Sequence, residues 1–122
     1  MRILLTRASV AMGDDATAPN AAERTLPDAA TLTELAALVA TAYVPRMGGA
    51  CWVLSLGYGA PAGPPLALLA EPWERPRLLP AAQRLGPLAA LADRDGELRT
   101  YCDYRWRESP EQVWRELTGR TP

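Results

Sequence analysis

The chain carries two thiols, Cys51 and Cys102, the side chains best suited to nucleophilic or metal chemistry. A catalytic thiol needs a base or a cationic neighbour that lowers its pKa, and zinc sites commonly combine Cys with His. This sequence of 122 residues has no His and no Lys, and its two cysteines form no Cys-x-x-Cys motif. We therefore predict two buried thiols, no metal, no cofactor and no catalytic residue, with a disulfide or a thiol-based enzyme as the alternative.

Carboxylates offer a second route to chemistry, because two of them suffice to hydrolyse a glycosidic bond. Glu71, Glu74 and Asp103 are the candidates, but nothing in their spacing favours such a pair. The run from Asp93 to Gly96 resembles the start of a calcium-binding loop, yet Tyr104 stands where the bidentate Glu of that loop would fall. We therefore interpret these acids as non-catalytic and the run 93–96 as a tight turn.

A group of charged and aromatic side chains is the strongest candidate for a binding surface. In the run 97–107, apolar residues alternate with a second set that shares one strand face: Arg99, Tyr101, Asp103, Arg105 and Arg107. Arg and Tyr are common in protein-binding hot spots, and Arg also pairs with anionic ligands. We predict partner contacts on this face, with an ordinary solvated sheet face as the alternative.

Trp73 is the second candidate contact, because it lies in a loop bounded by Pro72 and Pro76. A lid over the hydrophobic core is the alternative role for its indole. If both surfaces bind a partner, Arg105→Glu or Trp73→Ala weakens binding while the thermal stability hardly changes.

The overall charge and the N-terminus narrow the class of partner. The net charge is −1, so the basic excess of a generic nucleic-acid binder is missing. The apolar run near the N-terminus is three residues long, whereas a signal-peptide core has roughly 7–15. No stretch is long and apolar enough to span a membrane. We expect a cytoplasmic protein that binds neither nucleic acid nor membrane.

Alternating patterns and short apolar runs together predict five strands. They are expected over residues 2–12, 23–26, 51–56, 66–70 and 97–107. The first two would form a hairpin with a wide loop that starts at the turn Gly13-Asp14-Asp15, and the third and fourth a second hairpin. Residues 72–92 are rich in Pro and are expected to form an irregular crossover, with one short helical turn near Leu88.

Two helices have clear start signals. Thr31 and Glu34 form a capping box before an apolar stripe that continues to Tyr43, and Pro45 ends this helix. Ser109 and Pro110 introduce a second, shorter helix over 110–118, which Gly119 ends.

The order of these elements resembles a ubiquitin-like β-grasp domain. The segment 26–35, a strand end followed by a small turn and a capped amphipathic helix, carries the resemblance best. It implies an α+β fold in which one helix packs across a mixed sheet of four to five strands, here with a short C-terminal helix, in a single domain over residues 1–122. The C-terminus departs from ubiquitin, since it ends in Pro122 instead of a Gly-Gly tail.

Without catalytic equipment, the sequence favours a small interaction protein. Its Ala-rich, Lys-free composition is typical of a GC-rich bacterial genome. We expect a non-catalytic bacterial protein that binds a protein partner, as immunity-type inhibitors of toxins and adaptors do. A subunit of a homodimer or of a larger assembly is the alternative.

Overall fold

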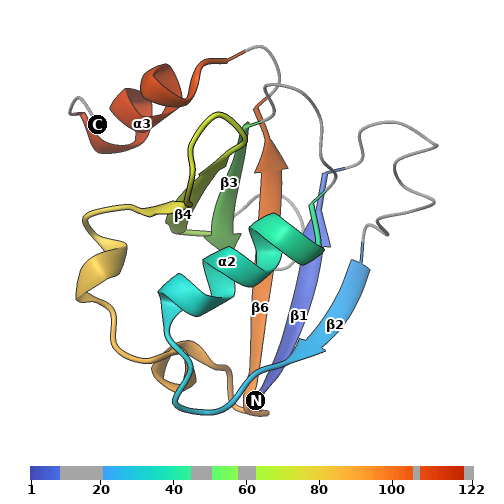
Figure 1. Ribbon diagram of the computed structural model, residues 1–122. Helices are drawn as coiled ribbons and strands as arrows, with labels where there is room; N and C mark the ends of the chain where they lie inside the picture. Colours follow the sequence, from blue (N-terminus) through green and yellow to red (C-terminus); the bar gives the residue numbers. More distant parts are fainter. Residues whose placement is uncertain (9–20, 45–50, 58–62, 106–107, 120–122) are drawn as a thin grey trace.

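Six strands form one mixed sheet in the order β2-β1-β6-β3-β4-β5 (Figure 1). The computed structural model describes residues 1–8, 21–44, 51–57, 63–105 and 108–119. β6 runs parallel to β1, and every other neighbouring pair is antiparallel. The strands are β1 (Arg2–Arg7), β2 (Ala21–Thr25), β3 (Cys51–Leu56), β4 (Pro65–Ala70), β5 (Arg77–Leu78) and β6 (Glu97–Tyr104).

The strand predictions agree with the structure in kind and differ at the ends. β3 has the expected bounds, whereas β1 and β6 stop at Arg7 and Tyr104. The predicted continuations over 9–12 and 106–107, like the turn at Gly13-Asp14-Asp15, lie outside the described residues. The crossover is more regular than expected: it contributes the two-residue β5, which makes six strands instead of four to five, and two 3-10 helices, η1 (Ala82–Arg84) and η2 (Leu88–Leu91).

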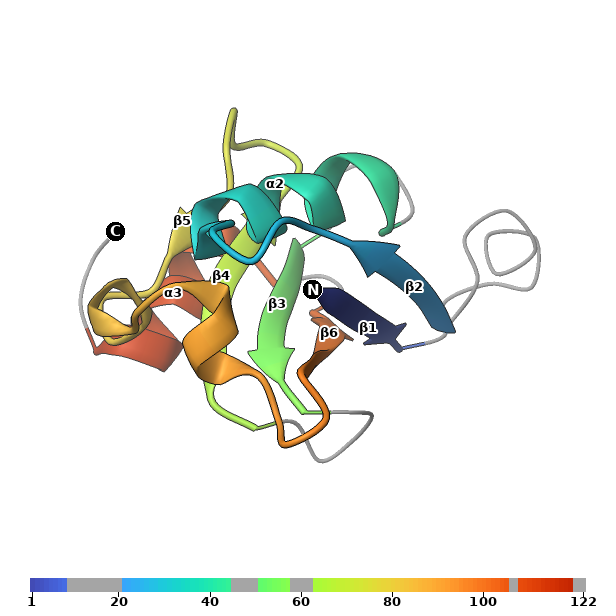
Figure 2. The ribbon, with the colours of Figure 1, turned by 90° about the horizontal axis from the view of Figure 1, so that it is seen from below.

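α2 (Leu32–Ala42) packs across one face of the sheet, as the resemblance implied (Figures 1 and 2). Its predicted cap is confirmed, since the backbone N–H of Glu34 donates to the Thr31 hydroxyl at 3.2 Å. Leu35 and Val39 are fully buried on the inner side of the helix. The fold is therefore an α+β arrangement of the β-grasp kind.

α3 (Pro110–Thr118) is the short C-terminal helix, with the predicted bounds. Its first turn is capped by Ser109, which accepts the N–H of Gln112 at 3.1 Å. Val113 and Trp114 are buried, and the helix packs against β4. Gly119 ends it with φ of 72°, a left-handed conformation that glycine adopts without strain.

The sheet is covered unevenly, which determines where a site can lie. β3 and β4 are apolar apart from Ser55, and residues from 51 to 55 and from 66 to 70 are all buried. Both faces of these two strands are thus covered, as in buried strands generally. Along β6, in contrast, Leu98, Thr100 and Cys102 are buried while Arg99 is exposed. The β3–β4 half of the sheet is therefore covered on both faces, whereas β6 is covered on one face only.

Within the described residues, no helix is long and apolar enough to cross a membrane.

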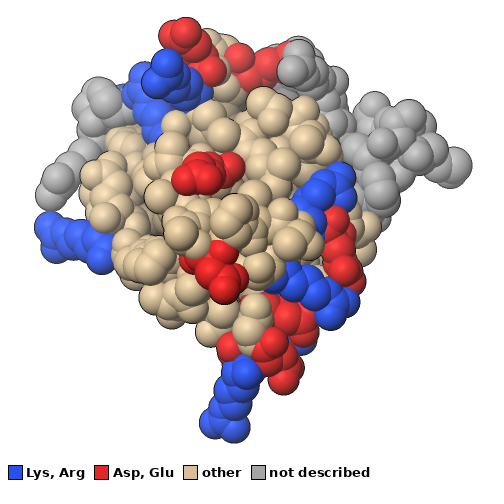
Figure 3. Space-filling model, turned by 60° about the horizontal axis from the view of Figure 1, so that its bottom comes forward, with Lys and Arg blue, Asp and Glu red and all other residues tan. Residues whose placement is uncertain are grey.

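The face shown in Figure 3 carries charges of both signs, with Arg side chains along its margin and acidic groups scattered between uncharged residues.

Candidate functional site

Three of the predicted partner-binding residues lie together on the sheet face opposite α2. Arg99, Tyr101 and Asp103 follow one another along that face of β6, and Leu4 of β1 is the register partner of Arg99. We call these four residues the open sheet face. The Arg99 side chain is 48% exposed, and the other three are half-buried.

The open sheet face mixes charges around an aromatic ring. The Arg99 guanidinium lies 3.6 Å from a carboxylate oxygen of Asp93. Partial burial, with the nearby Asp103 carboxylate as a smaller cause, raises the pKa of the Tyr101 phenol, so this group is a neutral donor at physiological pH. The open sheet face therefore offers a partner four kinds of group close together: a cation, a carboxylate, a phenol and an apolar side chain.

Arg105, also predicted to bind a partner, is turned toward α3. Its guanidinium donates to both carboxylate oxygens of Glu108, at 2.6 and 3.0 Å, and pairs with Glu116 of α3. The side chain is 18% exposed. These acceptors, Glu108 foremost, raise the pKa of Arg105 still further above its ordinary value. Arg105 thus ties α3 to the end of β6, and Arg107 lies outside the described residues.

Trp73 is half-buried and packs against Trp114 of α3 and the hydrophobic core instead of projecting from its loop. Its ring meets that of Trp114 edge-on, with centroids 6.2 Å apart, and the Arg77 guanidinium lies 4.1 Å from its centroid. Trp73 also packs against the hydrophobic core. The alternative reading of this residue, a lid over the core, describes its contacts better.

A pocket that the sequence did not reveal opens beside Trp73, on the α2 side of the sheet. It has a volume of about 240 Å³, and two tryptophans and two glutamates are among its lining residues. The full lining is Ala40, Thr41, Val44, Trp52, Leu69, Ala70, Glu71, Trp73, Glu74 and Pro76. We call this cavity the indole pocket. The sequence does not show that Trp52 and Trp73, which are 21 positions apart, line the same cavity.

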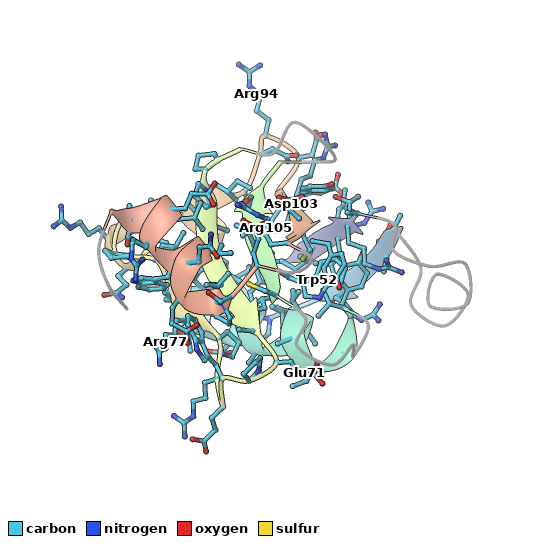
Figure 4. The ribbon with its side chains drawn as sticks, turned by 90° about the horizontal axis from the view of Figure 1, so that it is seen from above. Trp52, Glu71, Arg77, Arg94, Asp103 and Arg105 are labelled. Carbon is cyan, nitrogen blue, oxygen red and sulfur yellow. The ribbon has the colours of Figure 1, made fainter. Side chains whose placement is uncertain are left out.

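The three carboxylates considered as an acid and base pair do not converge. Glu71 and Glu74 line the indole pocket, whereas Asp103 is paired in register with Val53 on the opposite face. Figure 4 shows Trp52 and Glu71 on the α2 side and Asp103 beyond the sheet. The three groups are therefore not arranged to act on one bond.

The acids at the 93–96 turn support the backbone. The Asp93 carboxylate accepts the N–H groups of Asp95 at 2.9 Å and Glu97 at 3.1 Å, and Gly96 takes φ of 76°. Such a capped turn agrees with the prediction for this run. Among the described residues, no group of three or more Asp, Glu or Cys side chains is placed to hold a metal ion.

Both cysteines are free thiols buried within strands. Burial raises the pKa of Cys51 to about 11 and that of Cys102 to about 12. The neighbouring cations, Arg105 for Cys51 and Arg7 for Cys102, oppose this effect only partly. Thiols of this kind are protonated at neutral pH and poor nucleophiles.

Comparison of the chain with protein-family models, curated proteins and solved structures finds no match, so its function has to be inferred from the open sheet face and the indole pocket.

Proposed function

We propose that the protein is a non-catalytic interaction module that binds a protein partner through the open sheet face. The observation that carries this proposal is the uneven covering of the sheet. α3 packs against β4, and its Glu116 pairs with Arg105. Arg99 on β6, in contrast, stays exposed beside half-buried Tyr101 and Leu4.

The composition of the open sheet face suits a protein surface better than a nucleic acid. Arg and Tyr are enriched among residues that dominate binding energies, and the rigid Tyr side chain loses little conformational freedom on binding. Asp103 places a negative charge beside Tyr101. This carboxylate would repel the phosphate backbone of a nucleic acid, but it could pair with an Arg or Lys of a protein partner. Mixed charges of this kind give specificity for one protein surface.

The protonated, buried thiols disfavour the alternative of a thiol-based enzyme. In the finer version of the proposal, the protein is a cytoplasmic immunity-type inhibitor or an adaptor from a bacterium. It would act by occlusion, covering a functional site of its partner with the open sheet face.

The test is capture of the partner with wild-type and variant proteins, followed by reconstitution from purified components. Arg99→Glu reverses the exposed charge of the open sheet face and should abolish or strongly reduce recovery of a partner that wild type binds at a fixed stoichiometry. Arg84→Glu is the matched control, because Arg84 is an exposed residue of η1 outside the open sheet face.

Equal recovery by both variants, with unchanged thermal unfolding, would place the interface elsewhere. An inhibitor further predicts that an activity of the partner falls to a minimum at a fixed ratio, whereas an adaptor leaves the activity unchanged.

A second copy of the chain is the alternative partner. Light scattering on purified wild type distinguishes the two: a monomer over a range of concentrations agrees with a foreign partner. A dimer that Arg99→Glu dissociates would instead assign the open sheet face to self-association.

A further inference from the structure

We infer that the indole pocket is a binding site for a small organic cation, a protonated amine on an apolar body. This inference is independent of the proposed function, because the pocket lies on the α2 side of the sheet and shares no residue with the open sheet face.

The walls of the pocket have the composition that recognises organic cations. Electron-rich faces of Trp attract ammonium and guanidinium groups more strongly than other aromatic rings do. Trp73 already makes such a contact with Arg77, whose guanidinium carbon lies 4.1 Å from the ring centroid. This contact shows that the surroundings of the Trp73 ring accommodate a cation.

Charge at the mouth of the pocket points to the same ligand class. Glu71 and Glu74 are exposed, and both line the cavity. Neither carboxylate pairs with a cation among the residues that the structure describes. The described lining contains two Glu and no Arg, so its formal charge is negative, and Arg77 beside Trp73 offsets part of that charge. The remaining negative charge favours a cation over an anionic molecule.

One of the lining residues, Trp52, has a buried donor without a partner among the described residues. Trp52 is 2% exposed, and its indole N–H meets no acceptor among the described residues. Buried donors normally have a partner, and an exception calls for a water or a ligand.

The size of the cavity limits the ligand. A volume of about 240 Å³ is below the range of about 300–1,000 Å³ that is typical of drug-sized ligands. It suits a single ring or short alkyl body with one amine. A free small amine fits this volume better than a peptide, whose backbone would have to remain outside.

The experiment compares two probes that differ in charge alone. The cation 2-amino-1-phenylethanol and its neutral counterpart 1-phenylethane-1,2-diol are titrated into ¹⁵N-labelled protein, and the indole N–H signals are followed by NMR. The Trp52 signal is assigned with Trp52→Phe and the Trp73 signal with Trp73→Phe. We expect both signals to shift, with the amine binding roughly tenfold more tightly than the diol.

Charge variants show whether the carboxylates of Glu71 and Glu74 cause the preference for the amine. Replacing both Glu71 and Glu74 by Gln should weaken binding of the amine by roughly fivefold. Glu34→Gln is the matched control, because Glu34 is an exposed acid at the far end of α2 and Gln preserves a capping box. This control should leave binding unchanged.

The inference is overturned if the diol binds as tightly as the amine, if the Gln pair has no effect, or if neither indole signal responds at millimolar amine. Tighter binding of Nα-acetyl-arginine amide than of the free amine would also overturn it, since the site would then receive a peptide side chain. None of these outcomes bears on the open sheet face.

Discussion

Arg105 and Arg99 lie on the same strand face by sequence parity, but their surroundings differ. Arg105 is 18% exposed and donates two hydrogen bonds to Glu108, whereas Arg99 is 48% exposed and has one longer contact, with Asp93. An ion pair that is bidentate and part of a network contributes more than an isolated exposed pair. The sequence expectation that Arg105→Glu hardly changes stability therefore does not fit the contacts.

Replacement of Arg105 by Gln should lower the free energy of unfolding by about 1–2 kcal/mol, because Glu108 and Glu116 lose their shared partner. Arg99→Gln, the matched control, should change it by less than about 0.5 kcal/mol. Urea unfolding at neutral pH measures both values. Equal effects of the two variants would show that the Arg105 network does not hold α3.

The buried thiols predict a loss of stability in alkaline solution. Cys102 ionises at about pH 12 in the folded chain, against an ordinary thiol value of 9.0, and Cys51 at about 11. Above pH 9 the unfolded chain releases protons that the folded chain keeps. The free energy of unfolding should therefore fall by about 1.4 kcal/mol per pH unit for each thiol, while stability below pH 9 is unaffected.

Urea unfolding between pH 8 and pH 10.5 tests this slope, and Cys102→Ala should make it shallower. Thiol reagents at pH 8 should modify both cysteines only as fast as the protein unfolds. Rapid modification of either thiol in native protein would revive the hypothesis of a reactive cysteine.

At the scale of elements, local signals in the sequence were sufficient for both helices. Thr31 and Ser109 predict where the two helices begin, because the hydroxyl of an N-cap residue accepts a backbone N–H only three residues further along the chain. The sequence does not predict β5, because this strand comprises only Arg77 and Leu78 and is formed by pairing with β4. Pairing of that kind has no periodic signal within a two-residue segment.

Loss of the cap on α3 should cost stability without changing the fold. Ser109→Ala removes the acceptor for the Gln112 N–H and should lower the free energy of unfolding by about 1 kcal/mol. Ser109→Asp retains an acceptor and adds a favourable charge at the helix N-terminus, so it should be neutral or stabilising. If the two variants are equally destabilised, the cap does not hold α3.

At the scale of the whole molecule, the class of fold was predictable while the candidate sites were only partly so. The order of hairpin, helix, hairpin and strand implied one helix on a mixed sheet, and alternation along β6 placed Arg99, Tyr101 and Asp103 on one face. Which face α3 would cover depends on long-range packing. For that reason neither the inward turn of Arg105 nor the indole pocket between distant segments could be predicted.

The central claim is that the open sheet face binds a protein partner, and the affinity of the reconstituted complex tests it most directly. Calorimetric titration of the purified partner with Tyr101→Ala, Arg99→Glu and Arg84→Glu gives three dissociation constants, while thermal unfolding of each variant reports on its fold. The two substitutions on the open sheet face should each weaken binding by roughly tenfold or more, as at a hot spot, and Arg84→Glu should leave it unchanged. Folded variants of the open sheet face that bind as tightly as wild type would contradict the proposed function.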